Sequence, residues 1–100
     1  MVDQVIYDGE TDNVAVAATP VVTATDGSFV VKVWSATGAF DSGTVNVYIL
    51  ASDYTPILLQ AFTENGAYFG RVGSDELITA DITGVAGAAA DISCTVSRSR

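Results

Sequence analysis

The sequence has no histidine, a single cysteine and four basic residues against twelve acidic ones. Without histidine, the usual general base of hydrolytic triads and the commonest metal ligand are missing. One cysteine, Cys94, excludes a disulfide within the chain and a zinc site built from several cysteines. We therefore expect a protein that is not an enzyme, with no catalytic residue, no metal and no cofactor.

Basic residues are too few for a nucleic-acid surface. The formal net charge is −8 and two of the four cations, Arg98 and Arg100, stand in the last three residues, whereas phosphate binding needs clustered Lys and Arg. No apolar run approaches the ~20 residues that span a bilayer, and residues 1–6 lack the basic and apolar segments of a secretory signal. We expect neither nucleic acid nor membrane as a partner, and a chain made in the cytoplasm.

The residues that are abundant favour strands. Apolar residues make up 49% of the 100 positions, mostly valine and alanine, while aromatic residues make up 9%. Helix-forming Glu, Lys, Gln and Arg are scarce, and a chain of this length forms one domain that buries roughly two-thirds of its unfolded surface. The composition predicts an all-β domain with a thin core of β-branched side chains.

Short alternating segments recur about every ten residues between turn signals, which is typical of an antiparallel β-sandwich or a partly open barrel of about seven strands. Segments 13–18 and 20–25 flank Pro20, which favours an edge or a bend. Segment 84–90 is predicted to be a loop, with a short helical turn as the alternative that its two glycines disfavour. The other predicted strands are 28–36, 44–50, 57–62, 67–72, 77–83 and 91–97.

Residues 1–12 differ from the rest of the chain. They are polar and acidic, and Val5, Ile6 and Tyr7 are their main apolar contacts. We predict an extended N-terminal arm over residues 1–12 and a β-sandwich domain over residues 13–100. At the other end, the alternation of Ile92, Cys94 and Val96 places the Cys94 thiol on the apolar side of a strand, where it is inert core.

A few residues suggest chemistry, and each has a simpler explanation. Asp75 and Glu76 are adjacent, so a strand would point them to opposite faces. The acids of segment 8–13 resemble the start of a calcium loop, but Asn13 and Thr19 stand where that loop needs glycine and glutamate. Exposed tyrosines could stack on a sugar ring, although cross-strand aromatic packing is the stronger explanation; they are Tyr48, Tyr54 and Tyr68.

From Phe40 onward the sequence has a distinctive order of features. They are the strand Gly43-Thr44-Val45-Asn46-Val47-Tyr48, the turn Thr63-Glu64-Asn65-Gly66, the Gly-Ala-rich stretch 84–88, and the closing strand Ile92-Ser93-Cys94-Thr95-Val96. This order resembles small virion proteins of tailed bacteriophages. The likeness covers residues 40–97. Segment 53–56 departs from it, because Asp-Tyr-Thr-Pro stands where those proteins have an aspartate-glycine turn.

The resemblance implies a decoration or cement protein on the capsid surface of a virion, made in the host cytoplasm. Such proteins bind between subunits of the major capsid protein, often as a trimer, so the implied partners are the major capsid protein and copies of this chain. A carbohydrate-binding or adhesion module of a tail or surface structure is the alternative. Trp34 is either an exposed anchor or a core residue. The candidate partner-binding residues are Val5, Ile6, Tyr7, Trp34 and Tyr54.

Overall fold

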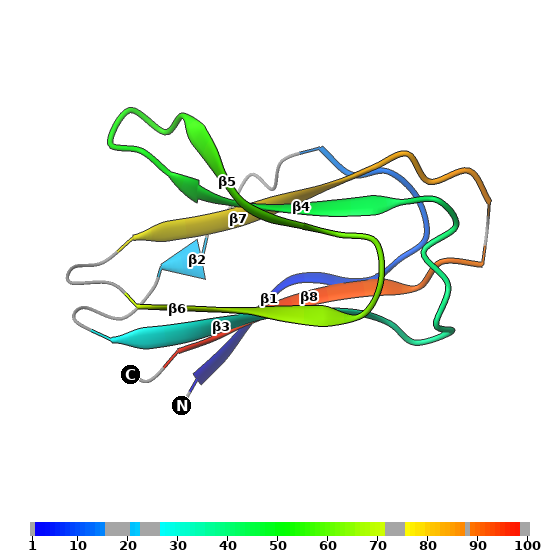
Figure 1. Cartoon of the computed structure of the whole chain (residues 1–100), viewed down its shortest axis with the longest axis horizontal. Coiled ribbons are helices and arrows are strands. Elements are labelled where there is room, and N and C mark those ends of the chain that lie inside the picture. Colours follow the sequence, from blue (N-terminus) through cyan, green and yellow to red (C-terminus); the bar gives the residue numbers. More distant parts are fainter. Residues whose placement is uncertain (1, 16–20, 23–26, 72–75, 88, 99–100) are drawn as a thin grey trace.

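The computed structural model describes residues 2–15, 21–22, 27–71, 76–87 and 89–98. These residues form two four-stranded antiparallel sheets that face each other and do not close into a barrel (Figure 1). The first sheet, with strand order β1-β8-β3-β6, is called sheet A, and the second, with order β2-β7-β4-β5, is called sheet B. The strands are β1 (Val2–Glu10), β2 (Val21–Val22), β3 (Ser28–Ser35), β4 (Thr44–Leu50), β5 (Pro56–Phe62), β6 (Gly66–Arg71), β7 (Leu77–Thr83) and β8 (Ile92–Arg98).

The core lies between the sheets and follows from alternation along the strands. In β3, Phe29, Val31 and Val33 are buried while the residues between them are half-buried or exposed. Branched side chains favour the extended backbone and pack well on a pleated surface. The buried apolar residues are Tyr7, Phe29, Val31, Val33, Phe40, Val45, Val47, Phe62, Ile78, Ala80, Ile82, Ala90, Ile92, Cys94 and Val96.

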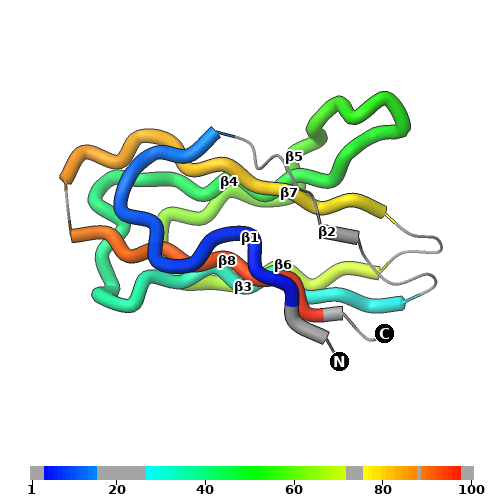
Figure 2. The backbone as a smooth tube through the Cα atoms, turned by 180° about the vertical axis from the view of Figure 1, so that it is seen from behind, coloured from blue at the N-terminus to red at the C-terminus, as the bar shows by residue number. Residues whose placement is uncertain are grey.

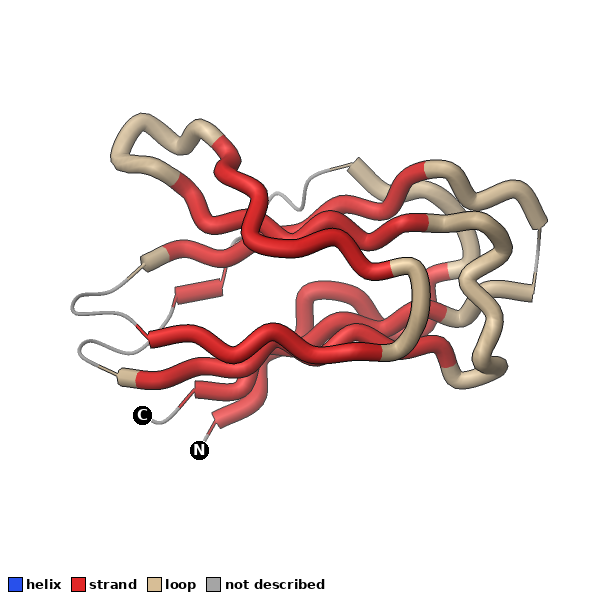
Figure 3. Tube along the Cα trace, in the orientation of Figure 1, coloured by secondary structure: helices blue, strands red, loops and turns tan. Residues whose placement is uncertain are grey.

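Strands β5 and β6 follow each other in the chain but belong to different sheets. Both are edge strands, and they lie on the same side of the sandwich, which faces the viewer in Figure 1. The opposite side, seen in Figure 2, carries β1 and β2. Loops gather at the two ends of the sandwich (Figure 3). The molecule therefore presents two outer sheet faces, two edge sides and two loop ends.

The predicted all-β sandwich is confirmed, and the six strands predicted from residue 28 onward correspond to β3–β8. Of the two segments predicted around Pro20, Val14 forms an isolated bridge with Ile82 and β2 covers Val21–Val22, while residues 16–20 and 23–26 lie outside the described part. In segment 84–90 the described residues form a loop without a helical turn. The described part of the chain contains no helix that could cross a membrane.

Residues 2–10 differ from the predicted arm, because they form β1 and pair with β8 along the edge of sheet A. Polar residues such as Gln4 and Asp8 obscured this strand, and the register shifts between Val5 and Tyr7 and between Tyr7 and Glu10. Edge strands accept polar residues and bulges because one side faces solvent. The first residues therefore belong to the sandwich.

At the right-hand end of the sandwich in Figure 1, the loop before β4 contacts the loop before β8. Asp41 and Ser42 have left-handed backbone with φ of 51° and 66°, and the Asp41 carboxylate reaches the loop that leads to Asp91. There it accepts hydrogen bonds from the backbone N–H groups of Ala89 (2.5 Å) and Ala90 (3.2 Å), while the Asp41 carbonyl accepts one from Ala86 (2.9 Å). Asp41 thus accepts hydrogen bonds from three backbone N–H groups of a loop that lies outside the strands.

We expect Asp41→Ala to lower the free energy of unfolding by about 1–3 kcal/mol, because it leaves two amide donors without their charged acceptor. Urea denaturation followed by circular dichroism measures this change. Asp12→Ala is the control, since Asp12 is exposed and its carboxylate accepts a hydrogen bond from the neighbouring Asn13 N–H; its effect should stay within about 0.5 kcal/mol. Equal stabilities of the two variants would contradict the role given to Asp41.

Candidate binding surface

The outer face of sheet A is formed by residues that alternate with the core positions. Strand register places Val30 opposite Phe69 and Ser97, and Lys32 opposite Ala67 and Thr95. Directly opposed residues on a sheet have Cβ atoms ~5 Å apart, and the next row lies about 7 Å along the strand. Four strands thus contribute to one continuous surface, called here the A face. Its exposed and half-buried residues from β3, β6, β8 and β1 are Ser28, Val30, Lys32, Trp34, Ala67, Phe69, Arg71, Thr95 and Val5. Ser93 and Ser97 of β8 share this side of the sheet by register but are buried.

Large apolar side chains are exposed on the A face. Phe69 is 78% exposed, Val5 is 61% exposed and Trp34 is 36% exposed. Val5, Thr95 and Lys32 lie opposite one another on neighbouring strands and form one row across the sheet. Trp34 lies in the next row on one side, and Phe69 lies in the next row on the other. Burial of such residues is the main source of binding energy in protein interfaces, and grouped exposure of this kind marks an interaction site.

The A face also has a distinctive charge. Lys32 and Arg71 lie on it, which are two of the four basic residues of the chain, and the outward residues of β3, β6 and β8 include no acid. On the edge strand β1, Asp3 lies opposite Ser97. With Lys32 and Arg71 against Asp3 by register, this side keeps a small excess of positive charge in a chain of net charge −8. A surface of this kind complements a partner that presents carboxylates around an apolar patch.

The outer face of sheet B carries an acidic cluster where β4 pairs with β7. Asn46 donates to Asp81 (2.8 Å), and the Tyr48 hydroxyl donates to the other carboxylate oxygen of Asp81 (3.0 Å). Desolvation raises the pKa of Tyr48, and the hydrogen bond to Asp81 raises it further. Because these groups satisfy one another, this cluster stabilises the pairing of β4 with β7.

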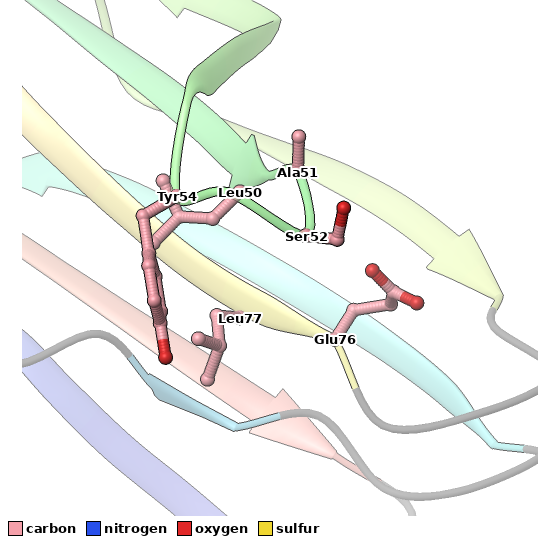
Figure 4. Close-up of a pocket in the computed structure, with 6 residues that line it drawn as sticks. All are labelled: Leu50, Ala51, Ser52, Tyr54, Glu76 and Leu77. Atoms are coloured by element: carbon pink, nitrogen blue, oxygen red, sulfur yellow. The ribbon is translucent and has the colours of Figure 1, made fainter.

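The tip of the β4–β5 hairpin carries a third exposed aromatic residue, apart from Trp34 and Phe69. Tyr54 is 68% exposed and has φ of 67°, and its N–H donates to the Ala51 carbonyl (2.9 Å). Hydrogen bonds from Thr55 hold the pKa of the Asp53 carboxyl below its ordinary value. An open hollow of about 430 Å³ lies beside the tip, with Tyr54 and Leu77 on one side and Ser52 and Glu76 on the other (Figure 4).

The candidate partner-binding residues predicted from the sequence fall into three places. Val5 and Trp34 lie together on the A face, and Tyr54 lies apart from them at the hairpin tip. Ile6 is half-buried against the core, and Tyr7 is buried, 5% exposed. Sequence reasoning missed Lys32, Phe69 and Arg71 as members of this surface. Their signal was the alternation of 67, 69 and 71 with Tyr68, which packs inward near Phe29 at a ring-centroid distance of 6.2 Å.

Two buried groups beneath the A face have shifted acidities. Cys94 is fully buried, and desolvation raises the pKa of its thiol to about 12. Desolvation also raises the pKa of Tyr7, and the negative charge of Asp81 adds to this shift. A thiol with such a pKa stays protonated at neutral pH, so the sequence-based assignment of Cys94 to the core is confirmed. The described residues contain no group of three or more His, Cys, Asp or Glu side chains placed to hold a metal ion.

No protein-family model, curated protein or solved structure matches this chain.

Proposed function

We propose that this chain is a non-catalytic structural protein of a bacteriophage virion that binds the outside of the capsid through its A face. The observation that carries the proposal is the group of exposed Val5, Trp34 and Phe69 side chains around Lys32 on one flat sheet face. Solvent-exposed aromatic and cationic groups together are the composition of interface hot spots. The pattern resemblance over residues 40–97 supports the choice of a virion as the setting.

The physical role follows from small size and repetition. A capsid presents the same site many times, so a 10.3-kDa domain that bridges neighbouring subunits adds stabilisation at every site. Linked contacts to two subunits raise the apparent affinity well above that of either contact. The basic A face fits a major capsid protein surface on which carboxylates surround an apolar patch, and the acidic remainder of the chain faces solvent.

The test is binding to particles. Virions purified from the source of the gene should contain this protein in many copies, and particles lacking it should rebind the purified chain. We expect Trp34→Ala to reduce the amount bound by at least about tenfold, since central interface aromatics contribute ~2 kcal/mol or more. Quantitative mass spectrometry of sedimented particles measures the bound copies.

The matched control is Tyr54→Ala, which removes an exposed aromatic ring away from the A face and should leave particle binding within about twofold of the wild type. Absence of the chain from purified virions would contradict the proposal. So would a loss of particle binding in Tyr54→Ala but not in Trp34→Ala.

A glycan-binding module is the second candidate, favoured by one observation. Trp34 and Phe69 offer aromatic rings on the same flat face, and a sugar ring stacks on such rings through its apolar C–H groups. Tyr48 and Tyr68, also predicted as sugar-stacking residues, engage Asp81 and Phe29 instead. Binding on a glycan array that disappears in Trp34→Ala, with no binding to particles, would favour this candidate over the capsid.

A further inference from the structure

Strand β6 is an exposed sheet edge without the usual protection against pairing. It pairs with β3 in a regular register over all its residues, with no bulge and no proline. Two of the other edges are irregular: β5 begins at Pro56 and contains a bulge, and β1 has two register shifts. On the fourth edge the described residues of β2 are Val21–Val22 alone. A straight strand edge with free N–H and C=O groups is a template for another strand.

The charges around β6 suit a second copy of the same chain. Between Glu64 and Arg71 the sequence has no charged residue, although the whole chain carries −8. Antiparallel pairing of β6 with its copy, about a twofold axis at Tyr68, puts Arg71 of one copy opposite Asn65 of the other, one residue from Glu64, at both ends. Each end of the interface then has one basic and one acidic residue close together, which offsets the general repulsion between acidic chains.

The apolar surface on this side also suits self-association. Phe69, the most exposed large apolar side chain described, points outward from β6 and lies close to the twofold axis in such a pair. Strand β5 lies on the same side of the sandwich (Figure 1), and its Ile57 and Leu58 are about half exposed. These side chains add apolar surface beside the edge that β6 offers to a second copy.

We propose that two copies of this chain pair through β6, so that their four-stranded A sheets become one continuous eight-stranded sheet. The proposal rests on the proposed function for its biological sense, because it places two A faces side by side on one flat surface. Each dimer then docks with two copies of Trp34 and Lys32, which raises its avidity for a repetitive capsid.

Sedimentation equilibrium of the purified chain tests the pairing directly, without any capsid. We expect a mass of twice 10.3 kDa for the wild type. Phe69→Glu should weaken self-association at least tenfold, since it places two like charges at the axis. Trp34→Glu is the control, because it adds the same charge to the same face on β3, away from the edge, and should leave the dimer intact.

A charge exchange tests the orientation of the two copies. Arg71→Glu should weaken the dimer, because the introduced carboxylate then lies one residue from Glu64 of the copy, and the double variant Glu64→Arg, Arg71→Glu should restore it. Circular dichroism verifies that each variant is folded. A folded wild type that sediments as a monomer or a trimer overturns the proposal, as does a double variant that stays dissociated. A monomer that still binds particles refutes pairing alone, and a dimer that does not bind them refutes the capsid function alone.

Discussion

Replacing Tyr7 with alanine is expected to lower the free energy of unfolding by about 3–5 kcal/mol, the range for truncating a buried aromatic side chain. Tyr7 belongs to β1 in sheet A, and its hydroxyl lies 2.5 Å from the Ala80 carbonyl oxygen of β7 in sheet B. It therefore joins the two layers by both packing and a hydrogen bond. The Ala15 carbonyl oxygen lies 3.2 Å from the same hydroxyl. Thermal or urea unfolding measures the loss.

Two variants separate the contributions to this effect. Tyr7→Phe keeps the ring and removes the hydroxyl, so it should lower the free energy of unfolding by about 1–2 kcal/mol through the unsatisfied Ala80 carbonyl. Val5→Ala, two residues away on the same strand but exposed, should change it by less than about 0.5 kcal/mol. If Tyr7→Ala were as stable as Val5→Ala, residues 1–12 would be a detachable arm after all.

The second large effect is a loss of stability in alkali. Desolvation raises the pKa of Cys94 from 9.0 to about 12 in the folded protein, so between these values the folded state holds a proton that the unfolded state releases. The corresponding stability is fully present below pH 9 and is lost as the pH rises toward 12, by about 1 kcal/mol for each pH unit. Tyr7, whose pKa is also raised from 10.0, adds to the loss above pH 10.

The measurement is urea unfolding at a series of pH values from 7 to 12 in the presence of a reductant. Cys94→Ala should flatten the decline between pH 9 and 10, where the thiol is the group that releases its proton on unfolding. Val31→Ala is the matched control, because it truncates a buried, non-ionising side chain on the adjacent strand β3; it should lower stability equally at every pH. If the free energy of unfolding fell with pH equally for the wild type and for Cys94→Ala, burial of the thiol would not be the cause of the decline.

Most of the strands were predictable because side-chain alternation is a local property. In β4, Val45 and Val47 alternate with Asn46 and Tyr48, and the structure buries the valines as that period requires. Cys94 was placed correctly for the same reason. The first strand was missed because Asp3, Gln4 and Asp8 weaken its period, and its backbone is held by hydrogen bonds to β8, more than 80 positions along the chain.

The candidate surface was predictable only in part. Exposure of Val5 and Trp34 agrees with their selection as binding candidates, but Tyr7 was selected for the same apolar character and is core. Hydrophobicity alone does not distinguish these cases, because the bulge between Val5 and Tyr7 decides which of them points inward. Phe69 could be selected as a binding candidate only once β6 was known to be an edge strand.

The sequence by itself determined the strand periods, the turns and the valine-rich core, because these depend on neighbouring residues and on the pleat of an extended chain. The tertiary structure alone decided that Val5, Lys32 and Phe69 share one face and that β6 has a free edge. Strand order is set by which distant segments pair, and the free energy of pairing depends on the packing of the whole sandwich rather than on any one segment.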